Sequence, residues 1–432
     1  MWSSFVNDKS KNGGLKELAK PGLVASTLFL LLFSGPPRFR YRDPTASLEG
    51  EIDTVVIVHA IVWGLAGIWI LSHFLPRSRR PWMEWRLVEK ASALFICWVW
   101  LSVIESAAPF LTAFRAYQMS VGFLFVALYI HLYGIEKCLE GVFWSSFLLC
   151  LGIAISALVV PDLVNDTSET GVGRLRGELI ADTGSVSALS IILLLGWMRR
   201  LWKPLFVFAF LLSFSLLIFS LERTAYAAVL GFAALAVLKS SGSRATKWIA
   251  GALLLGVGVF LSLGGMGLLG EFRDPDSIWT LSDRLGLWAY LSAVVMAKAP
   301  WTGLGYYAAS REYGPDYNPA LGTAHSMFVE ALVGAGIPAL ILLVALCAVL
   351  VLFTAKELRR GSRFSLPIAG LAVCVLFLGS VGGSIDAGPV AITFWAVAKM
   401  LSEESRKRVP RFVELHLVTH GMEPSSPSTT PG

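Results

Sequence analysis

Charged residues are scarce in this sequence. Only 15% of its 432 residues are Asp, Glu, Lys or Arg, whereas 55% are hydrophobic. Soluble domains usually carry about a quarter of charged residues. So few charges could not cover the surface of a water-soluble protein of this length. The mean hydropathy of +0.66 also indicates a membrane protein, and a large soluble catalytic domain is therefore excluded.

Cysteine is rare as well, and no two cysteines form a CxxC pair. The number of cysteines is odd, and the five residues lie in or beside apolar runs: Cys97, Cys138, Cys150, Cys347 and Cys374. Cysteines in such surroundings behave as small apolar residues. The sequence therefore predicts neither a disulfide framework nor a cysteine metal site. It also contains no HExxH, P-loop or GxSxG motif.

Long apolar runs recur along the whole chain. We predict about 12 transmembrane helices of roughly 20 residues each, which together would occupy over half of the chain. Their expected positions are 21–35, 53–75, 91–108, 112–133, 140–160, 184–198, 204–221, 224–238, 248–264, 326–353, 365–382 and 387–401. The predicted fold class is all-α, a multi-pass integral membrane protein.

The basic residues predict how the chain crosses the membrane. With both termini in the cytoplasm, most of the 36 Lys and Arg residues fall on the cytoplasmic side, as the positive-inside rule requires. The net charge of +6 then reflects orientation rather than nucleic-acid binding. The expected parts are a cytoplasmic segment 1–20, transmembrane helices 1–9 in 21–264, a periplasmic loop 265–325, transmembrane helices 10–12 in 326–401, and a mostly disordered cytoplasmic tail 402–432.

The long outer loop has a helical pattern in its middle. Between Ser277 and Ala297, apolar residues recur at helical spacing: Trp279, Leu285, Trp288, Leu291 and Val295. This pattern predicts an amphipathic helix lying on the outer surface of the membrane. Pro300 is expected to end the helix, and Gly303 and Gly305 to form a turn after it.

Two basic residues of the outer side stand out. Arg223 lies at a tight turn between two apolar spans, and an arginine at membrane depth costs about 2.5–3.5 kcal/mol. It could pair with Glu222, extend to the interface or bind an anion. Arg284 begins the loop helix, with Lys298 close to the same helical face. The alternative for Arg284 and Lys298 is a solvated helix surface. Arg174 and Arg176, taken alone, are ordinary loop residues.

His325 precedes the apolar span at 326–353. The N-terminus of a helix attracts anions through its free N–H groups and its dipole. The same positive end disfavours imidazolium, so this histidine is expected to stay neutral and could accept a proton from a hydroxyl group. A histidine that merely caps the helix is the alternative. Glu330 lies about one turn further on. Four other polar residues in the spans are candidates by membrane cost alone: His59, Glu105, His131 and Asp386.

Several of these pieces occur in an order that resembles the O-antigen ligase/polymerase superfamily of bacterial envelope glycan enzymes. They are SLERTAY with Arg223, SDRLGLW with Arg284, APWTGLGYY at 299–307, and His325-Ser326 followed by Gly336. The resemblance covers roughly residues 170–345. Ala339 departs from the ligase branch, which tends to have Gly, Thr or Tyr at this position, and the departure favours a polymerase.

The resemblance implies a metal-independent glycosyltransferase of the bacterial inner membrane with its active site facing the periplasm. The donor would be a glycan on undecaprenyl pyrophosphate, and the acceptor a hydroxyl group on lipid A-core, on another glycan or on a protein. Arg223 and Arg284 would hold the pyrophosphate, and His325 would assist the acceptor hydroxyl. We also expect four residues to contact the substrates: Arg174, Arg176, Lys298 and Glu330. No cofactor is expected.

Two other functions stay open on the sequence. A transporter or flippase for lipid-linked glycans would suit 12 spans, although carriers usually contain internal repeats and none is evident here. A metal-dependent glycosyltransferase could use Glu51 and Asp53 at the end of the first outer loop. Asp53 also suits the N-cap of a helix, and Asp274-Pro-Asp276 suits a turn.

Overall fold

The computed structural model is helical over nearly all the residues that it describes. These residues are 21–34, 54–74, 86–161, 165–167, 173–175, 181–198, 201–239, 251, 284–318, 323–383 and 385–406. Their helices are α1 (Leu23–Ser34), α3 (Thr54–Phe74), α4 (Leu87–Leu101), α5 (Pro109–Val159), α7 (Thr183–Gly196), α8 (Lys203–Ser220), α9 (Arg223–Leu238), α13 (Arg284–Lys298), α14 (Ala308–Tyr317), α15 (Met327–Arg360), α16 (Ser365–Val381) and α17 (Gly388–Arg406).

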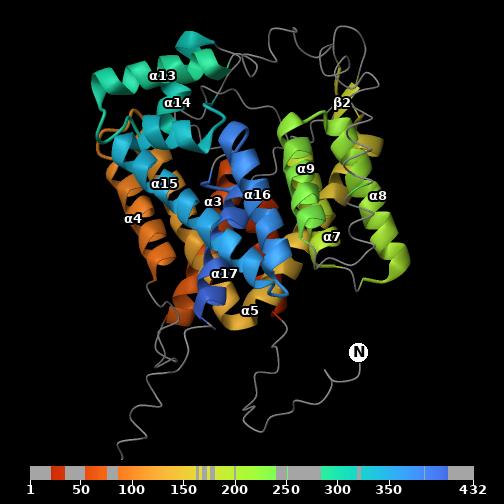
Figure 1. The fold of residues 1–432 in the computed structure, drawn as a ribbon. Helices are drawn as coiled ribbons and strands as arrows, with labels where there is room; N and C mark the ends of the chain where they lie inside the picture. Colours follow the sequence, from red (N-terminus) through yellow and green to blue (C-terminus); the bar gives the residue numbers. More distant parts are fainter. Residues whose placement is uncertain are drawn as a thin grey trace, which may run out of the picture.

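The helices form a bundle with a small cap at one end (Figure 1). α16 lies inside the bundle and packs against α9, α15, α17 and α7, while α5 packs against α17 and α7. α13 crosses the end of the bundle above α15, with α14 beside it. We call α13 and α14 the cap, and the end of the bundle that carries them the cap end.

The chain is an integral membrane protein by the length and composition of its helices. Within the described residues, four helices are long and apolar enough to cross a bilayer: α3, α5, α8 and α15. Shorter apolar helices, among them α7, α9 and α16, lie where the sequence predicts further spans. The count of about 12 spans stays a prediction, because the expected span 248–264 lies, except for Gly251, outside the described residues.

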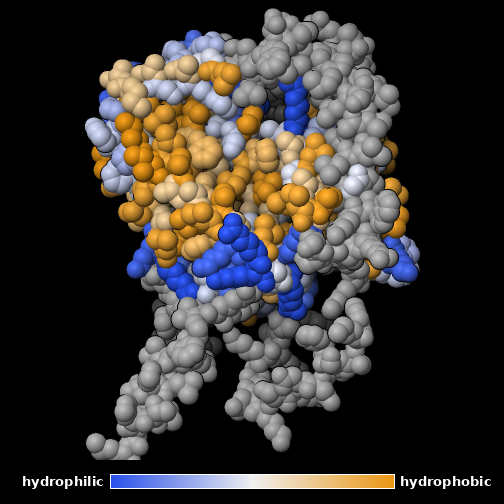
Figure 2. Space-filling view, in the orientation of Figure 1, coloured by the Kyte–Doolittle hydropathy of each residue, from blue (hydrophilic) through white to orange (hydrophobic). Residues whose placement is uncertain are grey.

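Apolar side chains face outward along these helices. Figure 2 shows a hydrophobic belt across one face of the bundle, with hydrophilic residues beyond its lower edge and a mixture of weakly hydrophobic and weakly hydrophilic residues over the cap. On α3 the outward residues include Ile57, Ile61, Leu65 and Ile68, all of them about half exposed or more. Exposed apolar area of this extent marks a surface that lipid or another protein covers.

Two predicted spans meet at a single glycine in the structure, without the expected loop between them. The sequence predicts spans at 112–133 and 140–160, whereas α5 runs from Pro109 to Val159 with a break at Gly134, where φ is 84° and ψ is 170°. This backbone conformation is readily adopted only by glycine. A single glycine therefore replaces the expected loop.

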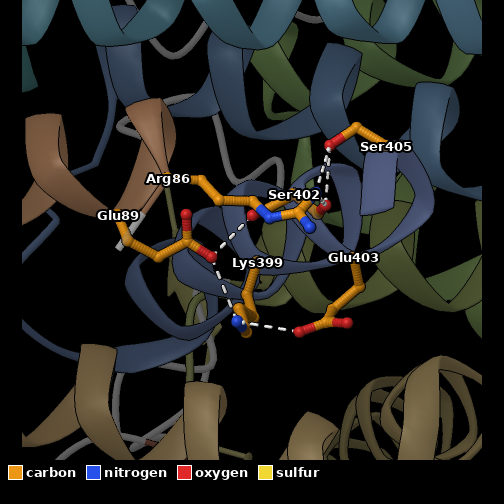
Figure 3. A network of polar contacts seen from close by, with 6 residues as sticks. All are labelled: Arg86, Glu89, Lys399, Ser402, Glu403 and Ser405. Carbon is orange, nitrogen blue, oxygen red and sulfur yellow. Dashed lines mark hydrogen bonds and ion pairs between the residues drawn. The ribbon is translucent and has the colours of Figure 1, made fainter. Parts of the chain in front are cut away.

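The bounds of α4 differ from the prediction because one of its charges is buried. The span was expected at 91–108, but α4 begins at Leu87 and ends at Leu101. Figure 3 shows that Glu89 accepts bonds from Lys399 at 3.0 Å and from Ser402 at 2.6 Å. Lys399 also pairs with Glu403 at 2.9 Å. Because these bonds compensate for the burial of its charge, Glu89 can lie within a helix. The helix α4 therefore begins before Glu89 rather than after it.

The cap differs from the amphipathic surface helix that the sequence predicts. The buried residues of α13 are Leu287, Leu291 and Val295. They pack against protein, including Leu304 and Val333, rather than facing a membrane surface. Leu285, which was expected on the apolar face, is exposed. The predicted residues before Arg284 lie outside the described part of the chain.

Two short elements were not predicted. α14 contains Gly314-Pro315, a pair that is typical of turns, yet it forms a helix from Ala308 to Tyr317. In the loop between α5 and α7, β1 (Asn165–Thr167) pairs antiparallel with β2 (Gly173–Leu175).

The five cysteines are free, as predicted, and only Cys97 among them is exposed. α17 extends to Arg406, beyond the predicted end at residue 401.

Candidate active site

The backbone at His325 is in a left-handed conformation. Its φ is 51°, a region that residues other than glycine seldom adopt. Ser326 is buried at the N-cap of α15, which begins at Met327. The half-buried His325 therefore lies just before the first turn of this long helix, one residue from where the sequence places the span.

Hydrogen bonds from the cap hold the residue before His325. The indole Nε1 of Trp288 donates to the carbonyl oxygen of Ala324 at 2.7 Å. The Ala324 N–H donates to the carboxylate of Glu330 at 3.2 Å. Ser310 of α14 donates to the same carboxylate oxygen at 2.7 Å. Both helices of the cap are thus attached to the start of α15.

The last turn of α16 is the common neighbour of the three segments that carry Arg223, Arg284 and His325. Arg284 donates from Nη1 to the carbonyl oxygen of Val381. A methyl group placed on Gly382 would lie 3.8 Å from side-chain oxygens of Glu222 and Thr224, on either side of Arg223. One placed on Gly379 would lie 2.6 Å from Sδ of Met327. The structure therefore brings the starts of α9, α13 and α15 together.

The turn before Arg223 fixes where α9 begins. Leu221 ends α8 in a left-handed conformation with φ of 50°. Thr224 donates to Glu222 at 2.9 Å, and the Tyr226 hydroxyl donates to the carbonyl of Ile218 at 2.8 Å. These bonds tie the motif SLERTAY to the end of the preceding helix. Arg223 is half-buried at this end of the bundle.

The backbone conformation of Gly336 explains why the fourth motif contains a glycine at this position. Here α15 is broken, with φ of 80° and ψ of −177°. The break frees carbonyl groups, and those of Val333 and Gly334 accept from the N–H groups of Leu304 and Gly305, each at 2.9 Å. The segment 299–307 therefore lies along the broken part of α15 and is attached to it by backbone hydrogen bonds. Its turn at Gly303 and Gly305, with φ of 71° and 100°, is confirmed.

A second group of charged residues at the cap end was missed by the sequence analysis. Arg115 of α5 pairs with Asp386 at 2.8 Å, and its guanidinium lies 3.8 Å from the ring centre of Tyr307. Arg311 of α14 lies 4.5 Å from the same ring centre and donates to the Tyr307 hydroxyl at 2.5 Å. Asp386 was a candidate by membrane cost, and the same argument applied to Arg115 would have suggested its partner.

Tyr306 lies beside this group. Burial, together with the carboxylates of Asp386 and Glu330, raises the pKa of Tyr306 well above its usual range. The phenol therefore stays neutral at any physiological pH. Its ring is fully buried, and its backbone N–H donates to Ser102 at 3.3 Å.

The remaining predicted residues that the structure describes are Lys298, Arg174 and Glu330. Lys298 ends α13 and lies 4.3 Å from the ring centre of Tyr313. With a rise of 1.5 Å per residue it is about 21 Å along the helix from Arg284. Arg174 lies in β2 opposite Asp166, and Arg176 lies outside the described residues. Glu330 is buried, with 2% of its surface exposed.

No group of three or more potential metal ligands occurs among the described residues. Glu51, Asp53, Asp274 and Asp276 lie outside that part of the chain, so the structure does not bear on the acidic pairs. Of the other polar candidates, Glu105 accepts a bond from Thr302, while His59 lies buried on α3.

A comparison with protein families matches residues 208–344 to the O-antigen ligase family. No curated protein matches the chain. The matched segment contains Arg223, Arg284, His325 and Gly336, the residues of the four motifs, while Arg115 and Asp386 lie outside it. The resemblance inferred from the motifs is therefore confirmed, since residues 208–344, which carry these motifs, match the O-antigen ligase family.

Proposed function

We propose that the protein is a membrane glycosyltransferase of the ligase or polymerase type. It would transfer a glycan from undecaprenyl pyrophosphate to a hydroxyl group of the acceptor. The observation that carries the proposal is the meeting of three segments around the last turn of α16, within a chain whose residues 208–344 match the O-antigen ligase family.

Arg223 and Arg284 would bind the diphosphate of the donor. A guanidinium group can bind phosphate oxygens in a bidentate manner. Arg284 is oriented by its bond to Val381, which uses one of its five N–H donors. Negative charge accumulates on the diphosphate as it leaves, so fixed positive charges stabilise the transition state more than the ground state.

His325 would accept the proton of the acceptor hydroxyl. The acceptor oxygen forms a bond to the anomeric carbon while the bond from that carbon to the pyrophosphate oxygen breaks. The proton passes to the imidazole, and the electron pair leaves with undecaprenyl pyrophosphate. In this reaction the two arginines take the part that a divalent cation has in other glycosyltransferases.

We further propose that the cap end faces the periplasm of a bacterial inner membrane. Basic residues are frequent at the opposite end, where Arg86, Lys356, Arg359, Arg360 and Arg363 lie, and Figure 2 shows a hydrophilic patch beyond the apolar belt there. The positive-inside rule supports a cytoplasmic position for this end.

Lys298 and Arg174 would contact the glycan rather than the diphosphate. Lys298 is at the far end of α13 from Arg284, and Arg174 lies on the hairpin beside α8. These positions suit a long donor or acceptor chain that extends from the reacting bond. Lipid A-core and a growing glycan are both possible acceptors, and an assay with each separates a ligase from a polymerase.

The test is transfer by the purified protein in proteoliposomes that contain a labelled undecaprenyl pyrophosphate-linked oligosaccharide. Arg223→Ala, Arg284→Ala and His325→Ala should each reduce product by about 10²–10³-fold, the usual effect of removing one preorganised donor. Arg363→Ala is the matched control, since Arg363 pairs with Glu136 at the opposite end. Near-normal transfer by all three variants would refute the site. Movement of the lipid-linked glycan without release of undecaprenyl pyrophosphate would favour a flippase.

A further inference from the structure

Glu330 forms hydrogen bonds to the two residues that flank His325 in the sequence, Ala324 and Ser326. Its carboxylate oxygen Oε1 accepts from the N–H of Ala324 at 3.2 Å, on one side of the histidine. Its own backbone N–H donates to the carbonyl of Ser326 at 2.9 Å, on the other side. Glu330 thus closes a short hydrogen-bonded ring that contains the backbone of residues 324–326, including His325.

Two further bonds hold this ring in place from the cap. Ser310 of α14 donates to the same Oε1 atom at 2.7 Å, and so fixes the carboxylate. Trp288 of α13 donates to the carbonyl of Ala324 at 2.7 Å. The peptide groups before His325 are therefore attached to α13, α14 and α15 at once.

The conformation of His325 needs such support. A left-handed φ in a residue other than glycine costs about 1–3 kcal/mol and persists only where its surroundings determine it. Without the bond to Glu330, the Ala324 N–H would lose its acceptor in a buried position, and the peptide could rotate. The direction of the imidazole would change with it, because the side chain leaves the backbone at a fixed angle.

We propose that Glu330 is a positioning residue that aims the imidazole of His325 at the acceptor hydroxyl. The proposal rests on the function proposed above, and it assigns Glu330 to His325 instead of to the substrate. The buried carboxylate, at 2% exposure, points to Ala324 and Ser310 and acts through them. A base must approach the hydroxyl within about 3 Å, and a misplacement of 1 Å lowers a rate by about 10²-fold.

Arg284 is part of the same arrangement. It lies one helical turn before Trp288 on α13, so the helix that anchors the guanidinium through Val381 also anchors Ala324. The guanidinium that would bind the diphosphate and the peptide group before His325 are therefore both held by residues of one helix.

The experiment compares Glu330→Ala with Glu330→Gln. The glutamine keeps a carbonyl oxygen for the Ala324 N–H and the Ser310 hydroxyl, whereas alanine removes it. We expect kcat to fall about 10²-fold in Glu330→Ala, with the KM for the lipid-linked oligosaccharide changed less than about threefold. Glu330→Gln should stay within about fivefold of the unchanged protein. Trp288→Phe, which keeps the ring and removes only the N–H, should lower kcat by about fivefold, as the loss of one hydrogen bond allows.

Hydrogen exchange provides a readout that does not depend on turnover. The amide of Ala324 should exchange faster in Glu330→Ala and at the normal rate in Glu330→Gln. Glu357→Ala is the matched control, because this buried carboxylate lies on the same helix at its other end and pairs with Arg360. It should change neither kcat nor exchange at residue 324.

Two outcomes would overturn the proposal. One is kcat within about threefold of normal in Glu330→Ala. The other is an inactive Glu330→Gln with normal exchange at Ala324, which would show that the charge itself takes part. If Glu330→Ala does not fold, Ser310→Ala releases the carboxylate from α14 and should lower kcat with normal donor binding. Unimpaired transfer by His325→Ala would instead refute the proposed function, so the two failures are distinguishable.

Discussion

Two buried clusters of charged residues lie at opposite ends of the bundle, and they differ in the backbone that carries them. Away from the cap, Lys399 bonds to Glu89 and Glu403 from regular turns of α4 and α17 (Figure 3). At the cap end, the cluster around Arg115 and Asp386 is built partly on Tyr307, whose φ is 68°. The first cluster joins two helices, whereas the second joins helices to strained connecting segments.

The strained residues are all at one end. Among the described residues, those other than glycine with positive φ are Leu221, Tyr307 and His325. The first lies two residues before Arg223, the second stacks on Arg115, and the third is the candidate base. Strained backbone tends to occur at functional sites. We therefore expect the functional site where buried charge lies beside strained backbone, and not at every cluster of buried charge in this bundle.

The comparison would be tested most strongly by Arg115→Ala. Removal of one partner of a buried ion pair destabilises a protein by about 3–5 kcal/mol, and here it removes the cation that pairs with the buried carboxylate of Asp386. Because Tyr307 also loses a stacking partner, transfer per folded molecule should fall by about tenfold. Thermal unfolding in detergent and the proteoliposome assay measure the two effects. A change in stability alone would make this cluster no different from the one at the other end.

Lys399→Ala should change stability only. It leaves Glu89 buried with the hydroxyl of Ser402 as its remaining partner among the contacts shown in Figure 3, and we again expect a loss of about 3–5 kcal/mol. Transfer by the folded protein should be unchanged. The matched control is Lys137→Ala, since the partly exposed pair Lys137–Glu140 should contribute less than about 1 kcal/mol. A fall in transfer at unaltered stability would extend the active site to the distal end.

Gly336→Ala should have a smaller effect on stability, of about 1–3 kcal/mol. The residue has φ of 80°, and an added methyl group would collide with the carbonyl of Trp301. The variant should also lower transfer, because segment 299–307 is displaced from α15. Gly64→Ala is the control: it lies within α3 with no atom near the added methyl group, and it should be neutral or stabilising. If the two variants were equally stable, the break in α15 at Gly336 would not contribute to the packing of segment 299–307.

The smallest effect is expected from chelation. If Arg223 and Arg284 neutralise the diphosphate, EDTA should leave the rate of transfer unchanged within about twofold. The measurement is the rate with EDTA against the rate with added magnesium. A rate that depends on the metal would favour the alternative with Glu51 and Asp53.

The sequence predicts the helices of the bundle well because apolar runs set their positions. It fails where contacts between distant residues decide, as at Glu89, whose buried partner is 310 residues away. It fails at Gly134, where a glycine replaces a loop, and at Gly314-Pro315, which lies inside α14. Local patterns cannot show these outcomes, since each depends on what packs against the segment.

The candidate site was only partly accessible to sequence reasoning. Order and spacing suggest Arg223, Arg284 and His325, but they do not show that the last turn of α16 lies among them. Arg115 lies in a helix far from the motifs, and only the fold brings it to Tyr307. The proposed role of Glu330 follows from its carboxylate oxygen Oε1, which accepts bonds from both Ser310 and Ala324. The spacing of these residues in the sequence does not predict that they share this acceptor.

The break at Gly336 has a mechanical consequence. The long part of α15 beyond it passes through the lipid and must tilt when the bilayer thickens or thins. Because the helix is interrupted there, and because Val333 and Gly334 just before the break are bonded to segment 299–307, we expect such tilting to be taken up at Gly336 rather than transmitted to His325. The candidate site residues would then keep their spacing in membranes of different thickness.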